Sequence, residues 1–135
     1  PTANSTTASA WWRLIAYDSG WRDITADASA TNVAVSLLAV RRVLHTVAYA
    51  ATTGSASGAG SVTHTLASGF EPSYTARHFQ IASNLSTNDA RITIAANGAT
   101  TVNIATGRAA DMQILYNAPA TLPTSLPGTE LTAPV

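Results

Sequence analysis

The longest apolar stretch of the chain runs from Val33 to Thr53 and alternates between two sets of side chains. Successive side chains of a strand point to opposite faces. One face would carry Val33, Val35, Leu37 and Ala39, and the other would carry Leu38 and Val40. Leucine and alanine also suit a helix, but the β-branched valines favour a strand. A reversal near Leu44-His45 would turn this stretch into a hairpin. Arg41 and Arg42 would then point to opposite faces.

Shorter runs predict further strands on either side of this hairpin. Trp21–Thr25 alternates apolar and polar residues, as a half-buried strand does. Additional strands are expected at Val62–Leu66, Tyr74–Ser83 and Met112–Tyr116. The last of these would place Met112, Ile114 and Tyr116 on one face.

The clearest hairpin surrounds Asn97 and Gly98. A two-residue turn would pair Ile94 with Thr101 and place the isoleucines on the wrong face, because a one-residue slip flips every side chain. A three-residue loop at 96–98 avoids this and puts glycine where a left-handed backbone is needed. The predicted pairs are then Ile92 with Val102 and Ile94 with Thr100.

About seven or eight short strands with a turn roughly every 8–12 residues indicate an all-β domain. The expected architecture is an antiparallel, jelly-roll-like β-sandwich. We expect three parts: a flexible linker or stalk end at residues 1–10, the β-sandwich at 11–121 and a proline-rich, extended C-terminal strap at 122–135. Leu122, Leu126 and Leu131 are expected to hold the strap against the sandwich or a neighbouring subunit. The small polar residues at the start suggest a piece of a longer protein.

The composition narrows the classes of partner. Hydrophobic residues make up 46% of the chain and charged residues only 10%, with seven acidic residues balancing seven arginines and no lysine. A neutral chain gives no electrostatic reason to bind nucleic acid. No apolar run approaches the roughly 20 residues of a membrane-spanning helix, so membrane insertion is not expected. The scarcity of charge has two explanations that stay open: surface buried against other subunits, or a GC-rich host that favours alanine and arginine codons.

The sequence predicts no catalytic site, metal or cofactor. It has no cysteine, and His45, His64 and His78 lack a metal-ligand spacing. No nucleophile elbow, phosphate loop or calcium loop is present. Asp18, Asp23 and Asp27 are better explained as solvated loop acids than as a glycosidase pair, which also needs a cleft. The chain is therefore expected not to be an enzyme.

Aromatic residues offer a binding hypothesis, because a flat ring packs well against a sugar ring. Trp and Tyr are equally enriched in cores and subunit interfaces, and we expect Trp21 to be a core residue. The loops at 54–61 and 84–89 are the expected contact surfaces, since binding residues often lie on loops held by a rigid scaffold. The candidate ligand-binding residues are Trp12, Tyr74, Asn84 and Asn88.

Four segments together resemble the C-terminal domains of minor tail proteins from tailed phages that infect actinobacteria. These segments are Asp18–Thr25, Val40–Val47, Leu66–Pro72 and Leu122–Thr129. Their order covers most of the chain after residue 18, and the absence of lysine fits an actinobacterial host. The chain departs from the family pattern at Leu44-His45, where a tight turn containing glycine is expected. Neither residue favours a positive φ, so either the hairpin is longer here or the domain is a distant member of the family.

The resemblance implies a head domain of a tail fibre or minor tail protein, located at the tail tip of the virion. Such proteins are typically homotrimers in which a stalk precedes a β-sandwich head that recognises the cell envelope. The expected function is recognition of the host cell surface, with a cell-surface polysaccharide as ligand. Two alternatives stay open. One is a trimerisation or capping domain without receptor binding, and the other is a carbohydrate-binding module of a secreted or virion-borne hydrolase.

Overall fold

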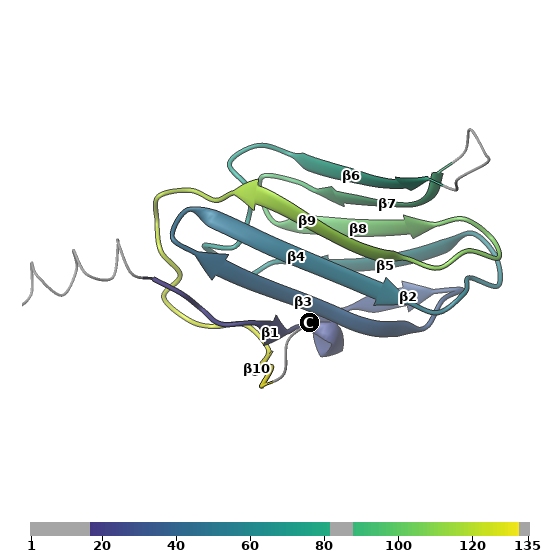
Figure 1. Cartoon of the computed structure of the whole chain (residues 1–135), viewed down its shortest axis with the longest axis horizontal. Coiled ribbons are helices and arrows are strands. Elements are labelled where there is room, and N and C mark those ends of the chain that lie inside the picture. Colours follow the sequence, from purple (N-terminus) through teal and green to yellow (C-terminus); the bar gives the residue numbers. More distant parts are fainter. Residues whose placement is uncertain (1–16, 82–87, 133–135) are drawn as a thin grey trace, which may run out of the picture.

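The computed structural model describes residues 17–81 and 88–132, which form two five-stranded antiparallel sheets packed face to face (Figure 1). Sheet A has the order β10-β1-β3-β4-β9 and sheet B the order β2-β5-β8-β7-β6. Sheet A comprises β1 (Arg22–Asp23), β3 (Val35–Val43), β4 (Thr46–Thr53), β9 (Asp111–Asn117) and β10 (Thr129–Glu130). Sheet B comprises β2 (Ser29–Thr31), β5 (Gly60–Thr65), β6 (Ala76–Ile81), β7 (Asn88–Ile94) and β8 (Ala99–Ile104). The predicted all-β sandwich is confirmed.

Sheet B contains a Greek key, in which β6, β7 and β8 follow one another as hairpins and β8 returns beside β5. The β7–β8 hairpin has the predicted register, with Ile92 opposite Val102 and Ile94 opposite Thr100. Gly98 adopts a φ of 87°, as the three-residue loop requires. The hydrophobic pattern and the turn residue therefore agreed on one register.

The connection between β3 and β4 is short, so the expectation of a longer hairpin is wrong. Val43 pairs directly with Thr46, so Leu44 and His45 form a two-residue turn. Leu44 has a φ of 54°, which is unfavourable for a leucine. Its N–H donates to the Tyr17 carbonyl at 2.9 Å and its carbonyl accepts from Arg42 Nε at 2.7 Å. These tertiary hydrogen bonds offset the backbone strain and were not visible in the local sequence.

The strand count exceeds the expectation, because the described part contains ten strands, three of them only two or three residues long. The run predicted at Trp21–Thr25 keeps strand geometry only at Arg22–Asp23. The Asp23 carboxylate then accepts the Thr25 N–H at 2.9 Å, and the 3-10 helix η2 (Thr25–Asp27) begins. Trp21 is half-buried, and the expectation that it belongs to the core is wrong. It flanks β1, which is covered on its outer side only by the two-residue strand β10.

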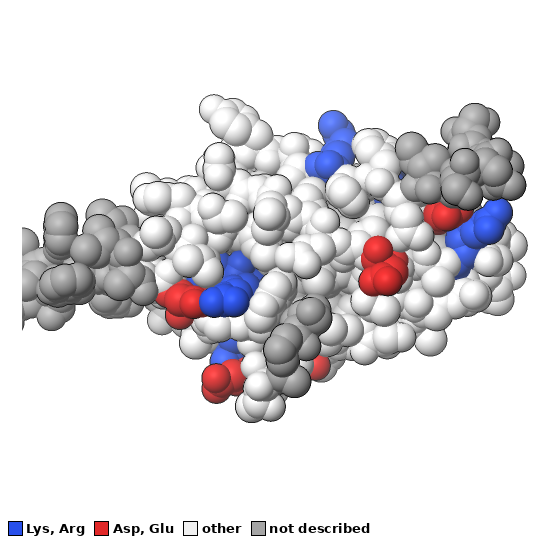
Figure 2. Space-filling model, in the orientation of Figure 1, with Lys and Arg blue, Asp and Glu red and all other residues white. Residues whose placement is uncertain are grey.

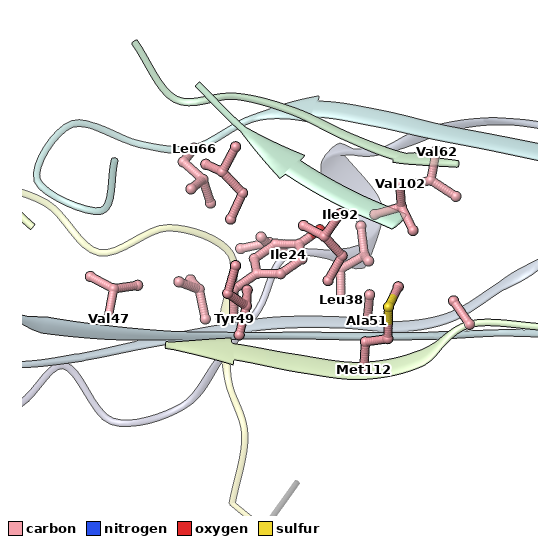
Figure 3. Packing of buried hydrophobic residues seen from close by; sticks show 14 of the residues in the cluster. Ile24, Leu38, Val47, Tyr49, Ala51, Val62, Leu66, Ile92, Val102 and Met112 are labelled. Carbon is pink, nitrogen blue, oxygen red and sulfur yellow. The ribbon is translucent and has the colours of Figure 1, made fainter. Parts of the chain in front are cut away.

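The core lies between the two sheets (Figure 3). Tyr49, Ala51 and Met112 contribute from sheet A, and Val62, Ile92 and Val102 contribute from sheet B. The prediction for the last long strand is confirmed, since alternate residues of β9 are buried. Those buried residues are Met112, Ile114 and Tyr116. The remaining side chains of both sheets form two outer faces.

Candidate functional site

Arg42 is a buried cation that ties three chain segments together. Its side chain is 0% exposed. The guanidinium donates to four backbone carbonyls, those of Leu44, Gly69, Pro119 and Thr121, at 2.5–2.8 Å. Its own N–H donates to Ser19 Oγ at 2.8 Å. Burial lowers the pKa of Arg42, but a guanidinium stays protonated in proteins. The charge is therefore matched by carbonyl dipoles.

The C-terminal segment is fixed by a second arginine and by two close backbone approaches. Arg22 donates to the carbonyls of Pro127 and Gly128 at 2.9 and 3.0 Å. A Cβ on Gly128 would lie 1.8 Å from the Asp23 carbonyl oxygen, and a Cβ on Gly69 would lie 2.7 Å from Pro123. These approaches leave room only for glycine. The C-terminal segment thus lies against β1 of sheet A as a strap.

The strap is held by its backbone and by Pro123 more than by its leucines. Pro123 is buried, Leu122 and Leu131 are half-buried, and Leu126 is 49% exposed. Leu126 therefore does not rest on the sandwich of its own chain, and its contact with a neighbouring subunit stays a prediction. The contacts of Arg42 and Arg22 join the four sequence segments that carry the resemblance into one interlocked unit. These segments therefore define the fold rather than a ligand site.

Tyr49 and His64 form a buried pair that bridges the two sheets. The Tyr49 hydroxyl lies 2.7 Å from His64 Nε2, and the two rings stack with centroids 5.5 Å apart. Burial raises the pKa of Tyr49 and lowers the pKa of His64 to about 4, with a smaller opposing effect from Asp27. At neutral pH both rings are uncharged, and the tautomer of His64 decides which of the two groups donates. His64 Nδ1 is buried and has no hydrogen-bond partner among the described residues. Neither ring nitrogen is presented to a ligand.

The outer face of sheet B carries a broad set of polar side chains, most of them neutral, together with two arginines and one phenylalanine. Strand register aligns them in two transverse rows. One row is Arg77, Thr93, Thr101, Thr63 and Ser29, and the next is Phe79, Arg91, Asn103, Ser61 and Thr31. We call this surface, with Thr65, the hydroxyl face. No side chain on it makes a hydrogen bond to another residue in the part of the chain that the structure describes.

Two shallow hollows lie on the hydroxyl face. One, of about 420 Å³, lies over β5, β7 and β8 and includes Ser61, Arg91 and Asn103 in its lining. The other, of about 580 Å³, lies over β2, β5 and β8 and includes Asp27 and Thr63. Hydroxyl, amide and guanidinium groups with free hydrogen-bonding capacity suit a ligand that is itself rich in hydroxyl groups. The face is therefore the candidate binding surface.

The residues predicted as a site are not brought together. Tyr74 is 86% exposed and lies near the end of β9, since the Ser73 N–H donates to the Asn117 carbonyl. Asn88 begins β7 at the opposite end of the sandwich (Figure 1), where it pairs with Ile81. Trp12 and Asn84 lie outside the described residues, as does the linker at 1–10.

The loop at 54–61 is bound closely to its neighbours. Its Ala56 N–H donates to the Arg108 carbonyl and its Ser57 N–H donates to the Asn32 carbonyl. Asn32 Nδ2 also donates to Ala59. Several backbone groups of this loop are therefore already hydrogen-bonded within the chain, whereas the side chains of the hydroxyl face make no hydrogen bond to another described residue. Sequence reasoning missed that face, although alternating Ser and Thr at 61, 63 and 65 marked its first strand.

Within residues 17–81 and 88–132, no group of three or more histidine, aspartate or glutamate side chains is placed to bind a metal. The same residues include no helix with the length and apolarity needed to span a bilayer. No known family, characterised protein or solved structure matches the chain.

Proposed function

We propose that this domain recognises a host cell-surface polysaccharide as the head of a phage tail fibre or minor tail protein, and that the hydroxyl face is its binding surface. The observation that carries this proposal is the set of exposed and half-buried hydroxyl and amide side chains that make no hydrogen bond to another described residue. A polysaccharide offers a matching series of hydroxyl donors and acceptors. The five strands span about 19 Å across a row, at about 4.8 Å per strand, so several sugar rings fit along it.

The phage assignment rests on the family resemblance of four segments, which lie in contact with one another in the fold. Four short segments, each weakly specific alone, contact one another through Arg42, Arg22 and two glycines. Residues that depend on one another in this way mark a common fold better than scattered matches do. Weak binding at each hydroxyl face would be strengthened by several copies acting together.

Retention on purified cell walls from a panel of actinobacteria tests the proposal. The variant Thr63→Ala/Thr101→Ala removes two hydroxyls that face each other across β5 and β8. Thr46→Ala is the matched control, because this exposed threonine lies on β4 of sheet A. We expect the wild type and the control to be retained and the double variant to lose about fivefold or more of its retention, or about 1 kcal/mol. Failure of the wild type to bind any wall contradicts the proposal, as does equal retention of the two variants.

Assembly as a homotrimer is a second proposal, favoured by the outer face of sheet A. Leu115 is 65% exposed and Val43 is 40% exposed. Leu115 lies opposite Ala48, and Ala48 lies opposite Arg41. Figure 2 shows that most of this side of the molecule is uncharged, with blue and red side chains at scattered places between white areas. Depletion of charge is typical of the core of a subunit interface. Light scattering gives the mass in solution, and a monomer at all concentrations would contradict this proposal.

A further inference from the structure

The described part of the chain contains six arginines. Four of them bind a carboxylate or a backbone carbonyl, and two have no such partner among the described residues. Arg41 pairs with Asp18 at 2.6 Å, and Arg108 lies 3.4 Å from Asp89. Arg22 and Arg42 donate to backbone carbonyls, as described above. Arg77 and Arg91 are exposed, and no hydrogen bond or ion pair joins either of them to another described residue.

These two arginines flank an exposed aromatic ring on the hydroxyl face. Phe79 is 45% exposed and lies directly opposite Arg91 on the neighbouring strand. Arg77 is two residues before Phe79 on β6, which places it on the same face. Diagonal cross-strand neighbours such as Arg77 and Arg91 have Cα atoms about 7–8 Å apart, within reach of one ligand for long side chains.

The local charge is positive although the whole chain is neutral. Asp89 precedes Arg91 by two residues on β7, but its carboxylate faces Arg108. Residues 82–87, which connect β6 to β7 in the sequence, contain no acidic residue. The potential around Phe79 is therefore not cancelled by a neighbouring carboxylate. Two like charges this close repel each other, and an anion bound between them relieves the repulsion.

We propose that Arg77, Phe79 and Arg91 form an anion subsite that takes a sugar ring bearing a carboxylate or phosphate group. The ring packs on Phe79, and the planar guanidinium groups bind the acidic substituent, a geometry for which arginine is well suited. The hollow of about 420 Å³ that Arg91 lines with Asn103 and Ser61 receives the rest of the chain of sugars. This inference rests on the proposed function and narrows its ligand to an acidic polysaccharide.

Paired polymers that differ in a single kind of acidic group test the subsite with the full chain. One pair is polygalacturonate and its fully methyl-esterified form, which tests a carboxylate. The other is a phosphomannan before and after phosphatase treatment, which tests a phosphate. We expect one acidic polymer to bind about tenfold tighter than its neutral counterpart at low salt, and the preference to decline as salt increases.

The variants R77Q, R91Q and F79A should each remove most of that preference. R41Q is the matched control, because it deletes the same charge from a half-exposed arginine on the other sheet, and its mass by light scattering must equal that of the wild type because Arg41 lies on the face proposed for assembly. It should change the affinity by less than about twofold. The subsite is wrong if neither acidic polymer is preferred, or if R41Q weakens binding as much as R77Q and R91Q. Equal binding of a dT oligonucleotide would also overturn it, since charge alone would then account for the affinity.

The two proposals fail in distinguishable ways. Retention on cell walls that depends on Thr63 and Thr101 but not on Arg77 or Arg91 overturns the anion subsite and supports the proposed function. Binding to an acidic polymer that depends on both arginines, without retention on any wall, supports the subsite and overturns the proposed function.

Discussion

Replacing Arg42 with methionine tests whether one buried cation holds the strap on the sandwich. Methionine keeps the apolar length of the side chain but removes all four hydrogen bonds to carbonyls. Hydrogen bonds from a charged donor contribute roughly 1.5–3 kcal/mol each, or about 6–12 kcal/mol for four before any cost is subtracted. Desolvation of the guanidinium offsets several kcal/mol of that sum.

The expected net loss is about 3–5 kcal/mol, because four carbonyl groups lose their donor at roughly 1–3 kcal/mol each, while methionine avoids the cost of desolvating a guanidinium. Small domains unfold with about 5–15 kcal/mol, so this loss is a large share of the total. Arg42→Lys should fall short of the wild type by about 2–4 kcal/mol, because an ammonium group has three donors and lacks the planar fork that spans these carbonyls.

Urea unfolding followed by circular dichroism measures these differences. Hydrogen exchange of residues 119–131 reports whether the strap is released first, since local opening exposes its amides. Arg41→Met is the control on the adjacent residue, where a half-exposed ion pair with Asp18 contributes about 0.2–1 kcal/mol. The reasoning is refuted if R42M loses no more than R41M. It is also refuted if R42M is destabilised while exchange in the strap is unchanged.

Two further predictions concern the buried histidine and the strained turn. Because the folded pKa of His64 is about 4 and the unfolded value about 6.5, the unfolded state binds the proton first, and stability falls as pH decreases from about 6.5 to 4 by roughly 3 kcal/mol. Urea unfolding across this range should show a smaller decrease for His64→Gln, and equal slopes would refute the assignment. Leu44→Asn should stabilise the domain by about 0.5–1 kcal/mol, because asparagine tolerates the φ of 54°. His45→Asn, at the other turn position, should bring no such gain in the melting temperature.

The registers of the long strands were predictable from the sequence because one face of each is buried. The alternation at Met112, Ile114 and Tyr116 has only one arrangement that puts these side chains in the core. The same constraint, with Gly98 as the turn residue, set the β7–β8 register. Short pairings such as β2 and β10 were not predictable, since two or three residues carry no periodic signal.

The candidate site was not predictable in the same way. Aromatic and loop residues suggested Tyr74 and the loop at 54–61, which the fold places apart. The hydroxyl face draws two or three residues from each of five strands, and their alignment depends on strand order. The threonines and arginines can be read from the sequence, but the residues that lie beside them on neighbouring strands cannot.

The sequence by itself determined the all-β class, the long hairpins and the opposite directions of Arg41 and Arg42, because burial and the period of two act along a single strand. Only the tertiary structure decided which arginine became the anchor of the strap and which two have no acceptor among the described residues. That decision depends on carbonyl groups up to 79 residues away in the chain. Distant partners of this kind leave no local pattern.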